Sequence, residues 1–303
     1  MNPFFVRAAA RAVLALIAAF VTLTASVHAA SAPGVLTVES VLSPAWVERA
    51  NGRREPLAVG MVLGNKEKVH TGDGGRALLR LADGSAFKLG DSALLGADEL
   101  NHKQDAKGGV VSASLDVVRG AFRFTTGLLA KSEAQRNVRV KVNAVTAGIR
   151  GTDVWGKSDS DRDIVCLLEG RINVTHGAAQ FTMQEPLSFY IAPRKGQAQP
   201  PSRVTADQVK QWQAETEIDA RSGATRSGGT AAVTVSSAGD ERTATALRDK
   251  LRDSGFPAEF ERAVEGGAAR YHVRILSLPD ADEAGVLAQR LQRQGYKQAR
   301  PGR

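Results

Sequence analysis

The stretch that decides the fold is "VRVKVNAVTAGIRGTDVWG", Val138–Gly156, near the middle of the chain. Its first five residues place valine at every second position, with a charged residue between each pair. An apolar–polar period of two is typical of half-buried antiparallel strands. The second half carries Gly148 and Gly151 around Arg150, a pattern that phosphate-binding loops, catalytic sites and strand turns share.

The residues around the two glycines decide between these three readings. A phosphate-binding loop needs G-x-x-x-x-G-K-[ST] between a strand and a helix, whereas "TDVWG" continues as a strand without that lysine. A nucleophile elbow needs a serine at the turn, and the stretch has none. We therefore predict a strand, a tight turn at Gly148–Gly151 and a returning strand, in which Arg150 pairs with Asp153 or covers the turn.

The same alternation extends from Val35 to about Ala192, and turn signals such as Asn51-Gly52 recur at short spacing. Many short strands without a helical period predict an all-β sandwich, barrel or solenoid-like coil over residues 35–195. Within it, "VRGAFRF" at Val118–Phe124 is echoed by "LEGRINV" at Leu168–Val174. A glycine at the centre of each echo predicts a bulge or a positive φ.

The N-terminus has the pattern of an export signal. Arg7 and Arg11 precede an apolar run that ends in Val27-His28-Ala29, a small-residue cleavage site. We predict a signal peptide over residues 1–29, cleaved near Ala29, so that the protein is periplasmic and meets the membrane only transiently. The alternative is an uncleaved anchor, which needs about 20 apolar residues, more than this run provides.

Composition narrows the class of partner. The chain has 303 residues, enough for about two domains, with 40 Lys and Arg against 32 Asp and Glu. The basic residues are spread among acids, and aromatic residues make up only 5%, so stacking platforms for bases are scarce. We therefore expect no nucleic-acid partner, while a weak attraction to anionic envelope polymers is compatible with this charge.

The sequence offers no catalytic group, metal site or cofactor site. Cys166 lies in the apolar run "DIVCLLEG", which predicts a buried and inert thiol over a nucleophile. The five histidines lack metal-ligand spacing. His70 with Asp73 comes nearest to a catalytic pair, and a surface turn is the favoured reading. We therefore predict a protein that is not an enzyme.

Beyond Pro193 the composition changes. Thr205 and Gln208 have capping-box spacing, which predicts a helix over residues 205–220 that docks on the β domain through Trp212. The next ten residues, 221–230, are rich in glycine and serine and predict a flexible linker.

Residues 231–303 contain a gapless internal repeat. "VTVSSAGDERTATALRDKLRDSGF" aligns with "VRILSLPDADEAGVLAQRLQRQGY" at a constant offset of 40 residues, as from Val233 to Val273. Each copy reads as a strand, an N-capping Asp, an amphipathic helix and a C-capping Gly. Short strands are predicted after each helix, at 258–263 and 297–300. The resulting order is βαββαβ, an α+β fold with a four-stranded antiparallel sheet and two helices on one face.

Two family resemblances rest on these motifs. "VTAGIRGTDVW" followed by "VCLLEGRINV" resembles the FecR domain family over about residues 35–192, which implies an exported β module with roles in signalling or envelope interactions. Only about a dozen residues precede the apolar run, so we do not expect the family's sigma-factor contact. The repeat resembles the SPOR domain over about residues 231–303, which implies binding to peptidoglycan glycan strands that lack stem peptides, and a place in the cell envelope and cell division.

Alternation assigns candidate glycan-binding residues. If the repeated valines face the helices, the opposite sheet face carries Thr234, Ser236, His272 and Arg274. Side-chain hydroxyls can form hydrogen bonds with sugar hydroxyls, and an arginine can bind the muramyl carboxylate through two hydrogen bonds. An ordinary solvated face is the competing reading. The sequence departs from the family pattern in the first strand, where Thr234 stands for Gln, Ser236 for Gly and Ala238 for Phe, which predicts altered glycan affinity.

The sequence therefore predicts a non-enzymatic periplasmic envelope protein. Its SPOR-like domain binds peptidoglycan. Its FecR-like domain binds an unknown partner, for which an envelope protein is a candidate. The alternative is a FecR-type signalling or protein-interaction component whose C-terminal domain is purely structural. An exported hydrolase is a third reading, and it would need a carboxylate pair or triad that the sequence does not show.

Overall fold

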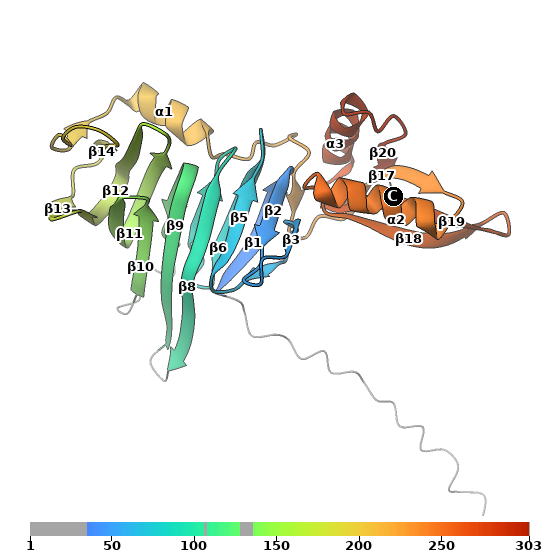
Figure 1. The fold of residues 1–303 in the computed structure, drawn as a ribbon, viewed down its shortest axis with the longest axis horizontal. Helices are drawn as coiled ribbons and strands as arrows, with labels where there is room; N and C mark the ends of the chain where they lie inside the picture. The colour runs from blue at the N-terminus through green and yellow to red at the C-terminus, as the bar shows by residue number, and fades with distance from the viewer. Residues whose placement is uncertain (1–34, 106–107, 128–135, 303) are drawn as a thin grey trace, which may run out of the picture. The chain divides into compact units, whose positions relative to one another are not determined.

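The computed structural model describes residues 35–105, 108–127 and 136–302 (Figure 1). The predicted signal peptide, residues 1–29, lies outside the described residues. Strands dominate the architecture, and three helices, α1 to α3, accompany them in the described ranges. In the same ranges, no helix combines the length and the apolar character needed to cross a membrane.

One large sheet makes up the N-terminal part and confirms the all-β prediction. Its strands are β1 (Leu36–Leu42), β2 (Ala45–Glu48), β3 (Arg54–Pro56), β4 (Val62–Leu63), β5 (Glu67–Thr71), β6 (Arg76–Leu81), β7 (Ala86–Leu89), β8 (Leu94–Asp105), β9 (Gly108–Thr125), β10 (Arg136–Val142), β11 (Val145–Ser158), β12 (Arg162–His176), β13 (Ala179–Met183), β14 (Ser188–Pro193), β15 (Ser202–Arg203) and β16 (Thr225–Arg226).

Strand pairing divides this sheet into two layers. Layer A runs β16-β1-β6-β7, continues through the later half of β9, the later half of β11 and the early half of β12, and ends in β14-β15. Layer B runs β3-β2-β5-β8, then the early half of β9, β10, the early half of β11, the later half of β12, and β13. Buried side chains from both layers form a single core, as in a sandwich whose long strands pass between layers.

Glycines mark the points where the long strands change layer. Gly120 in β9 and Gly170 in β12 have φ of +89° and +91°, as the echoed motifs predicted. Neither position accepts a side chain, because a Cβ at Gly120 would lie 2.5 Å from the Cβ of Ala93, and one at Gly170 would lie 2.4 Å from the carbonyl oxygen of Gly151. Positive φ and close backbone approach both require glycine here.

The predicted turn at Gly148–Gly151 is wrong. Strand β11 continues through both glycines without reversing, and its register against β12 shifts between Arg150 and Asp153. The chain reverses earlier, at Asn143, whose φ is +48°. The pairing of Arg150 with Asp153 is also wrong, because both carboxylate oxygens of Asp153 accept hydrogen bonds from Arg123, at 2.9 and 2.6 Å.

Helix α1 (Ala206–Ala214) packs on the outer surface of layer A (Figure 1). Thr205 caps it by accepting a hydrogen bond from the Gln208 amide, as the capping box predicted, although the helix ends at 214 and not at 220. The predicted docking through Trp212 is confirmed, since its indole stacks on that of buried Trp155, with ring centroids 4.8 Å apart and planes at 5°.

The segment from 221 to 230 does not run free between the domains as its composition predicts. Thr225 and Arg226 form β16, which pairs with β1, and Ser40 Oγ donates a 2.9 Å hydrogen bond to the Thr225 carbonyl. Upstream, the amides of Arg221 and Gly223 donate to the carboxylate of Glu283 in α3. Both the β domain and the C-terminal domain therefore hold this segment in place.

The C-terminal sheet confirms the βαββαβ prediction. Its elements are β17 (Ala231–Ala238), α2 (Glu241–Asp253), β18 (Ala258–Glu265), β19 (Ala268–Leu278), α3 (Ala281–Arg293) and β20 (Arg300–Gly302). The strand order is β18-β19-β17-β20, antiparallel throughout. Asp240 and Asp280 cap the two helices at equivalent positions of the repeat, and the helices share one core with the inward valines.

The two domains meet at Trp46 of β2. Its indole Nε1 donates a 3.2 Å hydrogen bond to the Asp253 carbonyl at the end of α2, and the neighbouring Ala45 amide donates to the Gly255 carbonyl. Gly255 has a φ of +79°, and a Cβ there would lie 2.8 Å from the indole ring. On α3, Arg290 donates to the Ser43 carbonyl at 2.6 Å.

We expect Trp212→Ala to destabilise the protein by about 3 kcal/mol, because it removes a large aromatic surface and exposes Trp155. Urea unfolding followed by circular dichroism measures the change. Lys210→Ala, an exposed position on the same helix, is the control and should shift the midpoint little. Equal effects of the two variants would show that the indole stack does not anchor α1.

We expect Gly255→Ala to loosen the contact at Trp46, because the new Cβ meets the indole ring. Gly295→Ala is a matched control, since Gly295 occupies the same place in the second repeat with a φ of +101° and nothing within 4 Å of its Cβ position. Hydrogen exchange at the Ala45 amide should accelerate about tenfold or more in the first variant only. The same acceleration in both variants would assign the effect to backbone strain.

Candidate functional site

The candidate glycan-binding surface is the face of the C-terminal sheet opposite its two helices, here called the open face. Register places Thr234 of β17 opposite Arg274 of β19, and Glu259 of β18 opposite the same arginine. Val273 and Ile275, on either side of Arg274, are buried in the helix-side core. Side chains alternate across a strand, so Arg274 and His272 lie on the open face, where the sequence predicted them.

Ser236 departs from the alternation that the sequence analysis used. The register of β17 shifts between Thr234 and Ser236, so Ser236 lies opposite buried Val273 and donates a hydrogen bond to Gln298. Its neighbour Ser237 takes the place opposite His272, with Ser237 Oγ 2.7 Å from His272 Nδ1. A bulge moves every later side chain to the other face, and an ungapped repeat gives no sign of it.

Carboxylates of β18 contact both Arg274 and His272 on the open face. Arg274 Nη1 donates a 2.8 Å hydrogen bond to Glu261, and His272 Nε2 lies 3.1 Å from Glu265. The side chains of Glu261 and Glu265 are 64% and 58% exposed, while those of Arg274 and His272 are 20% and 17% exposed. Arg274 and His272 are thus largely buried beneath carboxylates that are mostly exposed to solvent. Sequence reasoning missed both glutamates, although the alternation of β18 carries them.

Thr234 and Leu276 complete the description of the open face. Thr234 is only 8% exposed, so its hydroxyl contributes little accessible surface, and it lies opposite Arg300 of β20. Leu276 is 42% exposed and follows Arg274 on the same side of β19 by alternation. The open face therefore presents the exposed side chain of Leu276 beside the contacts that Arg274 and His272 make with the glutamates of β18.

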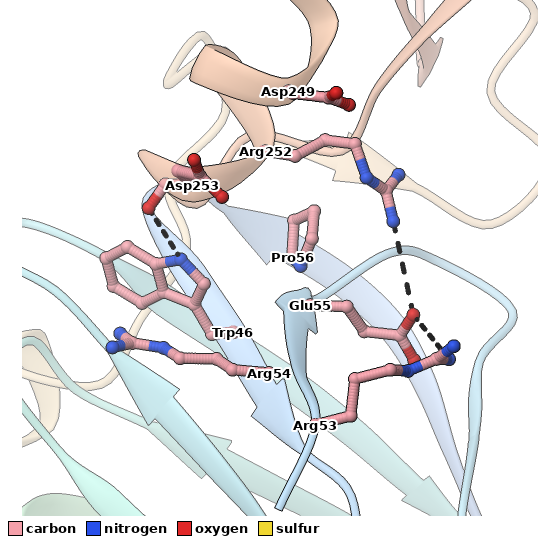
Figure 2. Close-up of a pocket in the computed structure, with 8 residues that line it drawn as sticks. All are labelled: Trp46, Arg53, Arg54, Glu55, Pro56, Asp249, Arg252 and Asp253. Atoms are coloured by element: carbon pink, nitrogen blue, oxygen red, sulfur yellow. Dashed lines mark hydrogen bonds and ion pairs between the residues drawn. The ribbon is translucent and has the colours of Figure 1, made fainter.

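A cleft of about 440 Å³ lies beside Trp46 where the two domains meet (Figure 2). Its lining comes from β2, β3 and α2: Trp46, Arg53, Arg54, Glu55, Pro56, Asp249, Arg252 and Asp253. The Arg54 guanidinium carbon lies 4.1 Å from the centroid of the Trp46 ring, a cation–π arrangement. Arg54 therefore covers that face of the Trp46 ring.

Glu55 links the two sides of this cleft. It accepts hydrogen bonds from Arg49 and Arg53, and Arg252 of α2 approaches it to 4.0 Å (Figure 2). Partial burial alone would raise the pKa of Glu55, but Arg49 and Arg53 outweigh it and hold the pKa below its usual value. The carboxylate is thus charged at neutral pH. The charged groups that line the cleft therefore hold the two domains in contact.

The groups that sequence analysis weighed for catalysis are not assembled into a site. Cys166 is fully buried under α1, and burial, with a smaller effect of the Asp153 charge, raises its pKa to about 12. The carboxylate beside His70 belongs to Glu48, 3.4 Å from Nε2. Within the described ranges, no group of three or more His, Cys, Asp and Glu side chains has the geometry to hold a metal ion.

We expect Cys166 to resist thiol reagents in the folded protein, because a buried thiol with a pKa near 12 carries almost no thiolate at neutral pH. Labelling with Ellman's reagent should proceed only as the chain unfolds, following the urea transition. Stoichiometric labelling of the native protein at pH 8 would contradict the buried, inert role.

Comparison with known proteins identifies both domains. Residues 67–173 match the FecR protein family, and residues 227–300 match the SPOR domain. The chain joins a FecR domain to a SPOR domain. Both are non-catalytic domain families; SPOR domains bind peptidoglycan, and FecR domains are associated with envelope signalling.

Solved structures add little to this identification. Two crystal structures of a candidate anti-sigma factor from Parabacteroides distasonis ATCC 8503 resemble the chain. One has 13% identity and a TM-score of 0.38, covering 48% of this chain and 64% of that one. The other has 12% identity and a TM-score of 0.39, covering 75% and 90%. Likenesses of this size carry no argument about function, and no curated protein matches the sequence significantly.

Proposed function

We propose that this chain is a non-enzymatic periplasmic protein that binds peptidoglycan glycan strands on the open face of its SPOR domain. The observation that supports this is the pair formed by half-buried Arg274 and solvated Glu261. An exposed carboxylate contributes little to such a pair, about 0 to 1 kcal/mol. A muramyl carboxylate can therefore replace Glu261 on the guanidinium at small cost.

The remaining groups of the open face fit a sugar chain. Ser237 and His272 form a polar pair next to Arg274 and can exchange hydrogen bonds with sugar hydroxyls. Leu276 offers an apolar contact for the carbon face of a ring. This set differs from the sequence-predicted one: Ser237 takes over from Ser236, and Thr234 lies largely beneath the surface.

Export follows from the signal peptide predicted over residues 1–29, with cleavage near Ala29. The FecR domain then lies close to the wall, held there through the SPOR domain and the contacts around Trp46. The partner of the FecR domain is then a component of the cell envelope, either a protein or a polymer. The alternative function is a FecR-type signalling component whose SPOR domain only stabilises the chain.

The test measures co-sedimentation of the mature chain, from Ala30 onward, with purified sacculi before and after amidase treatment, which removes stem peptides. Pelleting should increase after treatment. Arg274→Ala should weaken it by about tenfold or more, as expected for loss of a charge-assisted hydrogen bond. Glu261→Gln should strengthen it, because Arg274 loses its internal competitor.

Arg262→Ala is the matched control, since Arg262 is exposed on the same strand, next to Glu261, but lies opposite Tyr271 on the helix side. Its pelleting should equal that of the parent protein. Absence of pelleting from treated sacculi, or equal losses in the Arg262 and Arg274 variants, would reject the glycan-binding function and favour the signalling alternative.

A further inference from the structure

The outer surface of layer B carries a field of polar side chains that the proposed function does not use. Register aligns one row across the five strands β9 to β13: Ser114, Arg139, Gly148, Asn173 and Thr182. A parallel row holds Asp116, Lys141, Thr146, Thr175 and Gln180. Adjacent strands are about 4.8 Å apart, so each row spans roughly 20 Å. We call this surface the layer B field.

Positive charge predominates on the layer B field. Arg139, Arg150 and Arg171 are exposed, and within the described residues none of the three forms a hydrogen bond or ion pair. Lys141 pairs with Asp116 at 3.1 Å, and Glu169 adds a second carboxylate at the edge, beyond the bulge at Gly170. Exposed Glu99 of the adjacent strand β8 lies opposite Ser114 and adds a third carboxylate.

Arg150 and Arg171 lie directly opposite one another in the ladder between β11 and β12. Like charges at directly opposed positions destabilise an antiparallel pair. Among the described residues, no counter-ion or packing contact offsets the repulsion between these two arginines. An anion held between the two guanidinium groups would remove the repulsion and gain charge-assisted hydrogen bonds.

Gly148 provides a second, independent indication of a ligand. Its φ is not in the positive range, and a Cβ built there would meet no atom closer than 3.8 Å. The fold therefore does not require glycine at this position, unlike Gly120 or Gly170. A glycine within a strand without a conformational reason is typical of a site that something approaches closely. Arg139 and Asn173 flank this bare patch of backbone in the same row.

The geometry points to a second ligand site: the layer B field binds an extended, carboxylate-bearing polysaccharide across Gly148. The arginines take the carboxylates, the hydroxyl and amide side chains of the rows take the sugar hydroxyls, and a ring rests on the backbone at Gly148. The ligand class follows from the lining. The outward positions of both rows are polar, so the apolar anchors that a bound peptide needs are lacking along them.

This inference goes beyond the proposed function, since it concerns the other domain and a different surface. The test titrates the mature chain with fluorescently labelled polygalacturonate, an extended acidic polysaccharide, over a series of salt concentrations. Neutral dextran, poly-glutamate and phosphatidylglycerol vesicles serve as comparison probes. We expect binding to polygalacturonate that weakens with salt, weaker binding to poly-glutamate, and none to dextran or vesicles.

Two variants separate charge from shape. Arg150→Ser with Arg171→Ser should raise the Kd for polygalacturonate at least about tenfold while raising the melting temperature, because the repulsion between the arginines is gone. Gly148→Leu keeps the charge and should raise the Kd as well, since its side chain covers the backbone patch. Arg203→Ser with Arg242→Ser removes two exposed arginines elsewhere and should leave the Kd within about twofold.

Three results would overturn the inference: equal affinity for poly-glutamate with no effect of Gly148→Leu, vesicle binding that the double arginine variant abolishes, or equal losses in both double variants. Each variant is checked for its melting temperature, so misfolding is recognised. Arg274→Ala should leave polygalacturonate binding unchanged, which keeps this result distinct from success or failure of the sacculus experiment.

Discussion

The close approach of β11 and β12 at Gly151 and Gly170 is the constraint on which the FecR domain depends. The Gly170 Cβ position lies 2.4 Å from the Gly151 carbonyl oxygen, so any larger residue would force the strands apart. At this point β11 passes from layer B to layer A, and β12 passes from layer A to layer B. The crossing reverses which residues face the core, and it thereby sends Trp155 outward to meet α1.

Much of the fold was accessible from the sequence, because its signals were local. Period-two alternation gave the strands, the echoed glycines gave the positive φ at Gly120 and Gly170, and the repeat gave βαββαβ. The errors arose where tertiary contacts decide. Gly148 to Arg150 looks like a turn locally, yet pairing with β10 and β12 keeps it extended. Glycines and serines from 221 onward suggest freedom, yet hydrogen bonds to β1 and Glu283 fix them.

The candidate site was less accessible for a related reason. Arg274 and His272 follow from simple alternation, but the shift in β17 exchanges Ser236 for Ser237, and such a bulge leaves no trace in residue types. The glutamates that contact Arg274 and His272 lie on β18, outside the two repeated strands from which the candidate residues were predicted. The layer B field needs a register across five strands, which only the folded chain defines.

The pairing of β16 with β1 has a consequence for the synthesis of the protein and for where it can be cut into stable fragments. Strand β1 is among the first elements to be synthesised, and β4 pairs with the first half of the edge that faces away from β6. The partner for the second half of that edge, at Ser40 and Val41, arrives 185 residues later. Until then, this half of the edge is available to neighbouring chains, the usual starting point for aggregation. A fragment cut after the last long strand, β14, would carry that open edge permanently, so a well-behaved N-terminal fragment has to extend past Arg226.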